Sequence, residues 1–289
     1  MKCDPRFSKL PRNFWAYVRI ISERAGYTQR GSKTIKIPTQ AEISKVLKSL
    51  NLNSEILFNE KNQHAEFGKL ILEYFHYRAE LLNNYVAPLL MNASQAKEVF
   101  EGLKPSQGKK AKIPLNKQKG EKKQPAYFTS SINILIDKYS LEHPCDFDPR
   151  HLTIVSKNGN LLRALARRVD GAFPSAINPI AIWEIKEYYY TTTFGSRVAD
   201  GVYVTLLDGM ELAELYEHEG IKVLHYLMID SHYTWWECGK SYLCRIIDAL
   251  NMGYIHEVLF GKEIIARLPE CVTEWVALLK KEDPFSSQT

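Results

Sequence analysis

The sequence predicts a mostly helical N-terminal domain followed by an α/β domain. Three observations lead to this prediction. Apolar residues recur at helical spacing up to about residue 100, and a lysine-rich segment with three prolines follows. Beyond it, a helix precedes short extended runs that alternate with further helices, which is typical of a sheet flanked by helices. We therefore divide the chain into residues 1–100, a Lys-rich linker at 101–126, and an α/β domain at 127–289.

Composition places the chain among globular proteins. Of its 289 residues, 45% are hydrophobic and 11% aromatic, which is enough to build a sizeable core. No apolar run approaches the roughly 18 residues that a membrane helix needs, and the first residues lack the apolar region of a signal peptide. The five cysteines are scattered and form no C-x-x-C motif. We expect a soluble cytoplasmic protein without a membrane partner.

Three helices are predicted before the linker. The first covers residues 14–24 and the third covers residues 66–82. Between them, Thr39 with Glu42 three residues later forms a capping-box pattern at the start of a helix that reaches Leu50. The first two helices are compatible with a DNA-binding helix-turn-helix, although ordinary packing of small helices is the more common arrangement.

The positive charge of the chain is concentrated in the linker. Residues 101–125 hold eight lysines and two glutamates, whereas the formal charge of the whole chain is only +5. Such a segment attracts polyanions by releasing their counterions. It is also what a solvated linker, extended by its own repulsion, would look like. Both interpretations stay open at the level of the sequence.

The α/β domain begins with a helix near Ser131. Asn158 and Gly159 predict a tight turn between the first two extended runs, and Gly253 marks the end of the last predicted helix. The predicted extended runs cover residues 151–155, 165–173, 180–187, 221–230 and 254–260, and the predicted helices between them cover residues 196–217 and 240–251. The second run could instead start as a helix, because "NLLRALARR" contains good helix formers.

Glu184 and Lys186 interrupt the third of these runs. Strand side chains alternate between faces, so this charged pair shares one face, which we expect to border a cleft, while Trp183 and Ile185 anchor the other. Asp170 stands 14 residues earlier, on the preceding run. Two carboxylates on adjacent strands suit Mg²⁺, with the carbonyl of Ile185 as a further ligand. A neighbouring lysine can orient the attacking water and stabilise charge. The alternative is a surface ion pair, which contributes little.

These residues carry a resemblance. "VDGAF" followed by "IWEIK", in an α-β-β-β-α-β order, resembles the PD-(D/E)XK nuclease superfamily and type II restriction endonucleases in particular. The resemblance covers about residues 129–232, and Val169 replaces the proline of the motif. It implies a mixed central sheet, catalytic Asp170, Glu184 and Lys186, and metal ligation by the two acids and Ile185. It further implies Mg²⁺-dependent hydrolysis of double-stranded DNA by a homodimer.

An additional acid on the first helix of the domain is frequent in that superfamily. Asp137 and Glu142 are the candidates, and their spacing favours neither. Contacts with DNA phosphates are expected from Tyr188, Thr191, Ser196 and Arg197, because hydroxyls, arginines and helix N-termini commonly contact phosphates. The tyrosine could instead be an ordinary half-buried strand residue. The arginine could equally form an ion pair with Asp200 or Glu187.

Two other patterns do not support a site. Gly239-Lys240-Ser241 lacks the first glycine of a phosphate-binding loop, and the histidines at 218, 225 and 232 do not have zinc-site spacing. The sequence thus predicts a restriction-type endonuclease. A repair, recombination or phage-type nuclease of the same fold, and a non-enzymatic DNA-binding or regulatory protein, are the alternatives.

Overall fold

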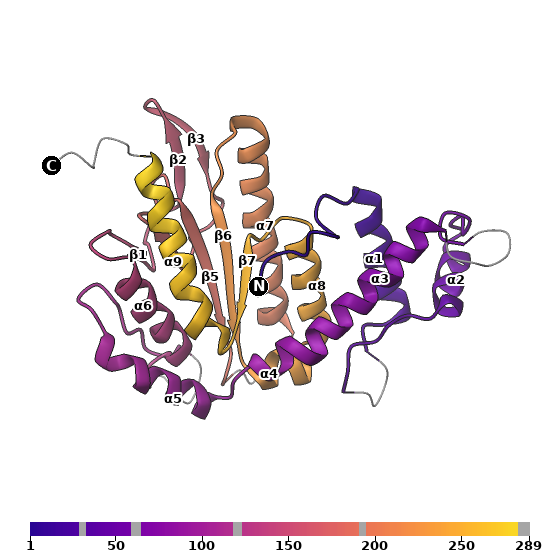
Figure 1. Ribbon diagram of the computed structural model, residues 1–289, viewed down its shortest axis with the longest axis horizontal. Coiled ribbons are helices and arrows are strands. Elements are labelled where there is room, and N and C mark those ends of the chain that lie inside the picture. Colours follow the sequence, from indigo (N-terminus) through magenta and orange to yellow (C-terminus); the bar gives the residue numbers. More distant parts are fainter. Residues whose placement is uncertain (29–32, 59–64, 118–122, 191–194, 283–289) are drawn as a thin grey trace.

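A computed structural model describes residues 1–28, 33–58, 65–117, 123–190 and 195–282 (Figure 1). The N-terminal part consists of α1 (Arg12–Ala25), α2 (Gln40–Ser49), α3 (Glu66–Glu80), a π-helical turn (Leu81–Val86) and α4 (Ala87–Leu89). Thr39 caps α2 and forms the predicted capping box with Glu42. Aromatic rings dominate the core between α1 and α3, where Phe14 and Trp15 pack edge-on against Tyr74.

The α/β part is built on a five-stranded mixed sheet with the order β1-β4-β5-β6-β7. β4 runs antiparallel to both β1 and β5, whereas β5, β6 and β7 are parallel to one another. The parallel strands are joined by α7 and α8, as parallel pairing requires a crossover. The strands of this sheet are β1 (Asp146–Phe147), β4 (Gly171–Phe173), β5 (Ala181–Glu187), β6 (Leu224–Asp230) and β7 (Glu257–Phe260).

Two layers of helices enclose the sheet (Figure 1). On one face lie α5 (Ala93–Leu103), α6 (Tyr127–Tyr139) and α9 (Glu263–Glu282), and on the other lie α7 (Ser196–Glu219) and α8 (Lys240–Asn251). A separate hairpin of β2 (Ile154–Lys157) and β3 (Asn160–Ala164) is inserted between β1 and β4. Its turn residues have positive φ angles of 52° and 78° at Asn158 and Gly159, as the sequence predicts.

The predicted extended run at 165–173 is wrong over its first six residues, which form neither a strand nor a helix. β3 ends at Ala164, and only Gly171–Phe173 forms a strand. The reason lies in Asp170, whose carboxylate accepts a hydrogen bond from the amide of Ile185 at 2.8 Å. This side chain takes the place that a main-chain carbonyl would occupy, and the backbone is free to leave the sheet.

Two of the longer helices are absent from the sequence prediction. α9 carries Pro269 in its second turn, and proline usually ends a helix. α5 crosses the predicted start of the linker and begins with a capping box of Asn92 and Gln95. No helix among the described ranges is long and apolar enough to cross a membrane.

A buried ion pair joins the N-terminal helices to the α/β part. Nη1 of Arg78 on α3 donates to both carboxylate oxygens of Asp248 on α8, at 2.9 and 3.0 Å. Tyr74 adds a hydrogen bond to the same carboxylate at 2.6 Å, and Ser22 accepts from the arginine at 2.9 Å. Both charged side chains are almost fully buried. The two parts of the chain are therefore fastened together by a buried hydrogen-bonding group.

A candidate active site at the start of strand β4

β5 places its side chains on the two faces of the sheet as the alternation predicts. Trp183 packs towards α9, where its ring stacks on Trp275 with centroids 5.6 Å apart. Glu184 and Lys186 point the other way, and the aliphatic part of the lysine lies beneath Gly201 of α7. A side chain at this glycine would have its Cβ 3.3 Å from Cδ of the lysine, so α7 packs closely over the pair.

Glu184 is fully buried and held by two cations. Arg167 donates to its two oxygens at 2.8 and 3.0 Å, and Lys186 donates at 2.5 Å. Burial alone would raise the pKa of Glu184, but the charges of Lys186 and Arg167 outweigh it and lower that pKa. Burial would likewise lower the pKa of Lys186, and the carboxylates of Glu184 and Asp170 raise it instead. The pair is therefore ionised at neutral pH.

Asp170 lies at the point where β4 begins and remains open to solvent. Its side chain is 43% exposed, and its Oδ2 lies 3.9 Å from Nζ of Lys186. Its own amide donates to the carbonyl of Trp183 at 3.2 Å and to Glu184 at 3.3 Å. Partial withdrawal from water and the neighbouring charge of Glu184 raise the pKa of Asp170 to about 6. The structure thus brings the three predicted catalytic side chains together.

Two further charged residues belong to this group and were missed by the sequence prediction. Arg167 lies in the irregular stretch before β4, and its Nη1 donates to Asp208 of α7 at 2.6 Å. The side chain of Asp208 is fully buried, and burial together with the charge of Glu184 raises its pKa to about 7. We call these five residues the β5 cluster: Arg167, Asp170, Glu184, Lys186 and Asp208. A signal for Asp208 existed, because it falls in helical phase with the buried Thr205 and Leu212.

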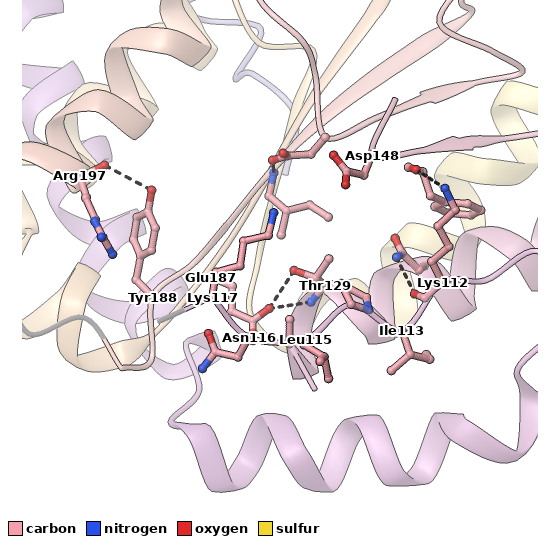
Figure 2. A pocket seen from close by; sticks show the side chains of 16 residues that line it. Lys112, Ile113, Leu115, Asn116, Lys117, Thr129, Asp148, Glu187, Tyr188 and Arg197 are labelled. Carbon is pink, nitrogen blue, oxygen red and sulfur yellow. Dashed lines mark hydrogen bonds between the residues drawn. The ribbon is translucent and has the colours of Figure 1, made fainter. Parts of the chain in front are cut away.

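A pocket of about 610 Å³ adjoins the β5 cluster on the α6 side of the sheet (Figure 2). Asp170 and Ile185 line it, whereas Glu184 and Lys186 do not. The expectation that the charged pair itself faces a cleft is therefore wrong, because α7 covers that face. Asp170 is the residue shared by the buried cluster and the open pocket.

Residues outside the predicted set complete the pocket wall. Glu187, at the end of β5, accepts hydrogen bonds from the amide and hydroxyl of Thr129 at 2.9 and 2.8 Å. Asp148 lies across the pocket from them in Figure 2. Its φ of 53° is unusual for a residue other than glycine and marks the sharp turn that follows β1. Neither residue lies in a sequence pattern that would have identified it.

The lysine-rich segment forms one side of the same pocket. Residues 112–117 line it, and Figure 2 shows Lys112 and Lys117 on this wall. Parts of the segment are packed rather than solvated. Nζ of Lys110 donates to the carbonyls of Leu141 and His143 at 2.7 and 2.8 Å, beyond the end of α6. Lys112 donates to the carbonyl of Phe147 at 2.9 Å.

Asp137 helps to hold the lysine-rich segment against α6. Its carboxylate accepts from the amides of Lys110 and Ala111 at 3.2 and 2.9 Å, and it does not line the pocket. Glu142 does not line it either. Neither of the two suggested helix acids thus reaches the pocket, where the helix contributes Thr129 and Asn133 instead.

Two of the four predicted phosphate contacts lie at the opposite wall. Tyr188 and Arg197 line the pocket, and the tyrosine hydroxyl donates to the arginine carbonyl at 3.3 Å (Figure 2). The tyrosine ring also stacks on Trp235, with centroids 5.7 Å apart. Ser196 is exposed at the first position of α7. Thr191 lies outside the described residues.

Some of the oxygen atoms around Asp170 are suited to bind a hard divalent cation. Within the described ranges, no three His, Cys, Asp or Glu side chains are grouped to hold a metal ion. Mg²⁺, however, commonly takes one or two carboxylates together with waters and a substrate phosphate. The amide of Ile185 reaches Asp170, and the carbonyl of a strand residue points to the same edge as its amide. Asp170 and that carbonyl therefore meet at the pocket, whereas Glu184 would first have to release a cation.

Comparison with known proteins identifies two family models along the chain. One, described as Domain of unknown function (DUF7690), matches residues 1–85. The other, described as Domain of unknown function (DUF7687), matches residues 91–275, which include the sheet, the β5 cluster and the pocket. No curated protein and no solved structure matched the chain. Since the second model covers more than half of the sequence, the chain belongs to the family described as Domain of unknown function (DUF7687).

Proposed function

We propose that this protein is a Mg²⁺-dependent endonuclease that hydrolyses phosphodiester bonds of double-stranded DNA at specific sequences. The observation that carries the proposal is the position of Asp170. It lies in an open pocket, 3.9 Å from a buried lysine, and its amide contacts the carboxylate of Glu184. An acid just before β4, with an acid and a lysine on the neighbouring β5, can hold a metal ion at a phosphodiester and stabilise the charge that develops during its hydrolysis.

The order of the elements supports a PD-(D/E)XK core. α6, β1, β4, β5, α7 and β6 follow one another as α-β-β-β-α-β, once the β2-β3 hairpin is set aside as an insertion. The first three strands are antiparallel neighbours, and the fourth is parallel to the third. The acid and the lysine of the motif lie on the third of these strands, and Asp170 immediately precedes the second.

The walls of the pocket support a phosphate-bearing substrate. Lys112 and Lys117 come from one side and Arg197 from the other, and Asp170 lines the same pocket (Figure 2). Cations on both sides of a carboxylate site can hold the backbone of a nucleic acid strand against it. A homodimer would place one such site on each strand of a duplex.

In this proposal each residue has a defined task. Mg²⁺, when bound, supplies charge neutralisation at the scissile phosphate and lowers the pKa of a coordinated water. Asp170, Glu184 and the carbonyl of Ile185 would hold it. Lys186 is charged and donates hydrogen bonds, so it orients the attacking water and stabilises the negative charge of the transition state.

The test compares two buried lysines. Lys186 and Lys240 are 8% and 7% exposed, but the second donates to the carbonyl of Trp236 at 2.5 Å and belongs to no carboxylate pair among the described residues. Wild type, Lys186→Met and Lys240→Met are incubated with long duplex DNA in Mg²⁺ or in EDTA. We expect discrete fragments from wild type and Lys240→Met in Mg²⁺ only, and intact DNA with Lys186→Met. Cleavage by Lys186→Met at the wild-type rate would refute the assignment.

The pattern of products separates the alternatives. Cleavage restricted to nicks, ends or junctions would indicate a repair, recombination or phage-type nuclease. DNA binding without cleavage, under every metal condition, would indicate a non-enzymatic DNA-binding protein and would remove the catalytic role of the β5 cluster.

A further inference from the structure

Both oxygens of the deepest candidate ligand accept hydrogen bonds from cationic side chains. Glu184 accepts from Arg167 at Oε1 and Oε2 and from Lys186 at Oε2. A cation that binds this carboxylate must displace at least one of these donors. Lys186 is buried to 8% exposure and covered by α7, so it has little room to leave. Arg167 is 26% exposed and lies in an irregular segment, so it is the donor that can move.

Arg167 already touches a second carboxylate. Its Nη1 lies 2.6 Å from Oδ2 of Asp208. The other oxygen of Asp208, Oδ1, is buried and finds no hydrogen-bond partner among the residues that the structure describes. A buried carboxylate oxygen without a donor is unfavourable. Arg167 donates to both Glu184 and Asp208. Asp208 can therefore accept one more hydrogen bond from the guanidinium of Arg167.

We propose that Asp208 receives Arg167 when a divalent cation binds Glu184. The arginine exchanges its paired contact with Glu184 for a paired contact with Asp208, and Glu184 becomes free to ligate. Arg167 and Asp208 are then positioning residues that set the affinity of the site for its cation. The inference rests on the proposed function, since it requires that the β5 cluster bind a divalent cation.

The exchange predicts opposite effects of two substitutions. Asp208→Asn removes the acceptor charge, so Arg167 stays on Glu184 and Mn²⁺ binds about 10–100-fold more weakly, the usual range for residues that support a ligand. Arg167→Met removes the competitor, so Mn²⁺ binds as tightly as to wild type or more tightly. If the arginine merely held Glu184 in position for the metal, Arg167→Met would weaken binding instead.

A double-mutant cycle tests the coupling directly. Mn²⁺ affinity is measured by titration calorimetry for wild type, both single variants and Arg167→Met/Asp208→Asn, after circular dichroism shows that each is folded. If Asp208 acts through Arg167, Asp208→Asn has no effect in the Arg167→Met background. Glu211→Gln, one turn further along α7, is the control for the loss of a nearby negative charge. We expect it to change affinity by less than about twofold, since glutamine can keep the hydrogen bond from the amide of Ala166 and partly exposed charges interact weakly.

The outcomes separate this inference from the proposed function. An equal loss from Asp208→Asn in both backgrounds would overturn the exchange and leave the metal site standing. Wild type that binds no Mn²⁺ at all would overturn both. Should Asp208→Asn fail to fold, Asp208→Glu keeps the charge, and the exchange then predicts that it retains more Mn²⁺ affinity than Asp208→Ala.

Discussion

The Arg78–Asp248 pair and the β5 cluster are both buried groups of charges, and they differ in balance and access. The first matches one cation with one carboxylate, and neighbouring hydroxyls add hydrogen bonds to both. The β5 cluster contains two cations, Arg167 and Lys186, and three carboxylates, one of which, Asp170, lines a pocket. A closed, balanced pair contributes to structure. An unbalanced group with an excess carboxylate beside an open pocket is suited to take up a cation.

The largest effect on stability is expected from breaking the balanced pair. Asp248→Asn leaves the guanidinium of Arg78 buried without a counter-charge, which should lower the free energy of unfolding by about 3–5 kcal/mol. Urea denaturation of the two proteins measures this difference. A loss below about 1 kcal/mol would show that the pair is not a structural fastening.

A buried carboxylate that pairs with no cation among the described residues provides the pH control for this comparison. Asp230 accepts from the amides of Met91 and Ser231 and from the hydroxyl of Tyr189, and burial raises its pKa to about 7. In the unfolded chain this carboxyl has a pKa near 4, so the folded state binds more protons between about pH 4 and 7. The contribution of Asp230 to stability therefore rises as the pH falls from about 7 to 4.

Comparing wild type with Asp230→Asn isolates that contribution. We expect the stability of wild type relative to the variant to increase on acidification through this window, measured by urea denaturation at several pH values. A difference that is independent of pH would contradict the raised pKa.

Access to the β5 cluster can be tested from the basic wall of the pocket. Lys117 is exposed and lines it. If it contacts one phosphate, Lys117→Gln should weaken DNA binding and reduce the slope of log affinity against log salt by about 0.9. Binding measured by fluorescence anisotropy at several salt concentrations gives both quantities. Lys262→Gln, an exposed lysine outside the pocket, is the control and should leave the slope unchanged.

The smallest effect on stability is expected from Asp208→Asn. This is the same change of residue type as Asp248→Asn, but it lies in the β5 cluster. Asp208 has its pKa raised to about 7, so its charge is only weakly favoured at neutral pH. Asp208→Asn should change the free energy of unfolding by less than about 1 kcal/mol in the absence of metal. A loss as large as that of Asp248→Asn would show that the two groups are equivalent structural pairs.

The parts of the site that could be predicted depend on short-range geometry. Asp170, Glu184 and Lys186 meet because side chains alternate along β5 and because β4, which Asp170 immediately precedes, pairs with the next strand in the sequence. The contribution of Arg167 and Asp208 depends on how α7 is rotated over the sheet. That rotation follows from packing between distant elements, and the pattern of α7 alone shows only that Asp208 occupies a buried phase.

The fold was predictable to a similar extent. The α/β architecture and the Asn158–Gly159 turn follow from residue patterns. The late start of β4 does not, because it results from the side chain of Asp170 replacing a main-chain acceptor. The lysine-rich segment was likewise only partly predictable. Its charge is evident in the sequence, but its position against α6 is set by Asp137 and by the carbonyls that receive Lys110.

The most direct test of the central claim is the rate of cleavage of long duplex DNA in Mg²⁺ by wild type and by Asp170→Asn. Asp170 is the one member of the β5 cluster that lines the pocket, so its carboxylate should be needed for hydrolysis and dispensable for folding. The account predicts a loss of about 100-fold or more in rate with DNA binding retained. Wild-type rates from the variant, or no cleavage by wild type at any metal concentration, would contradict it.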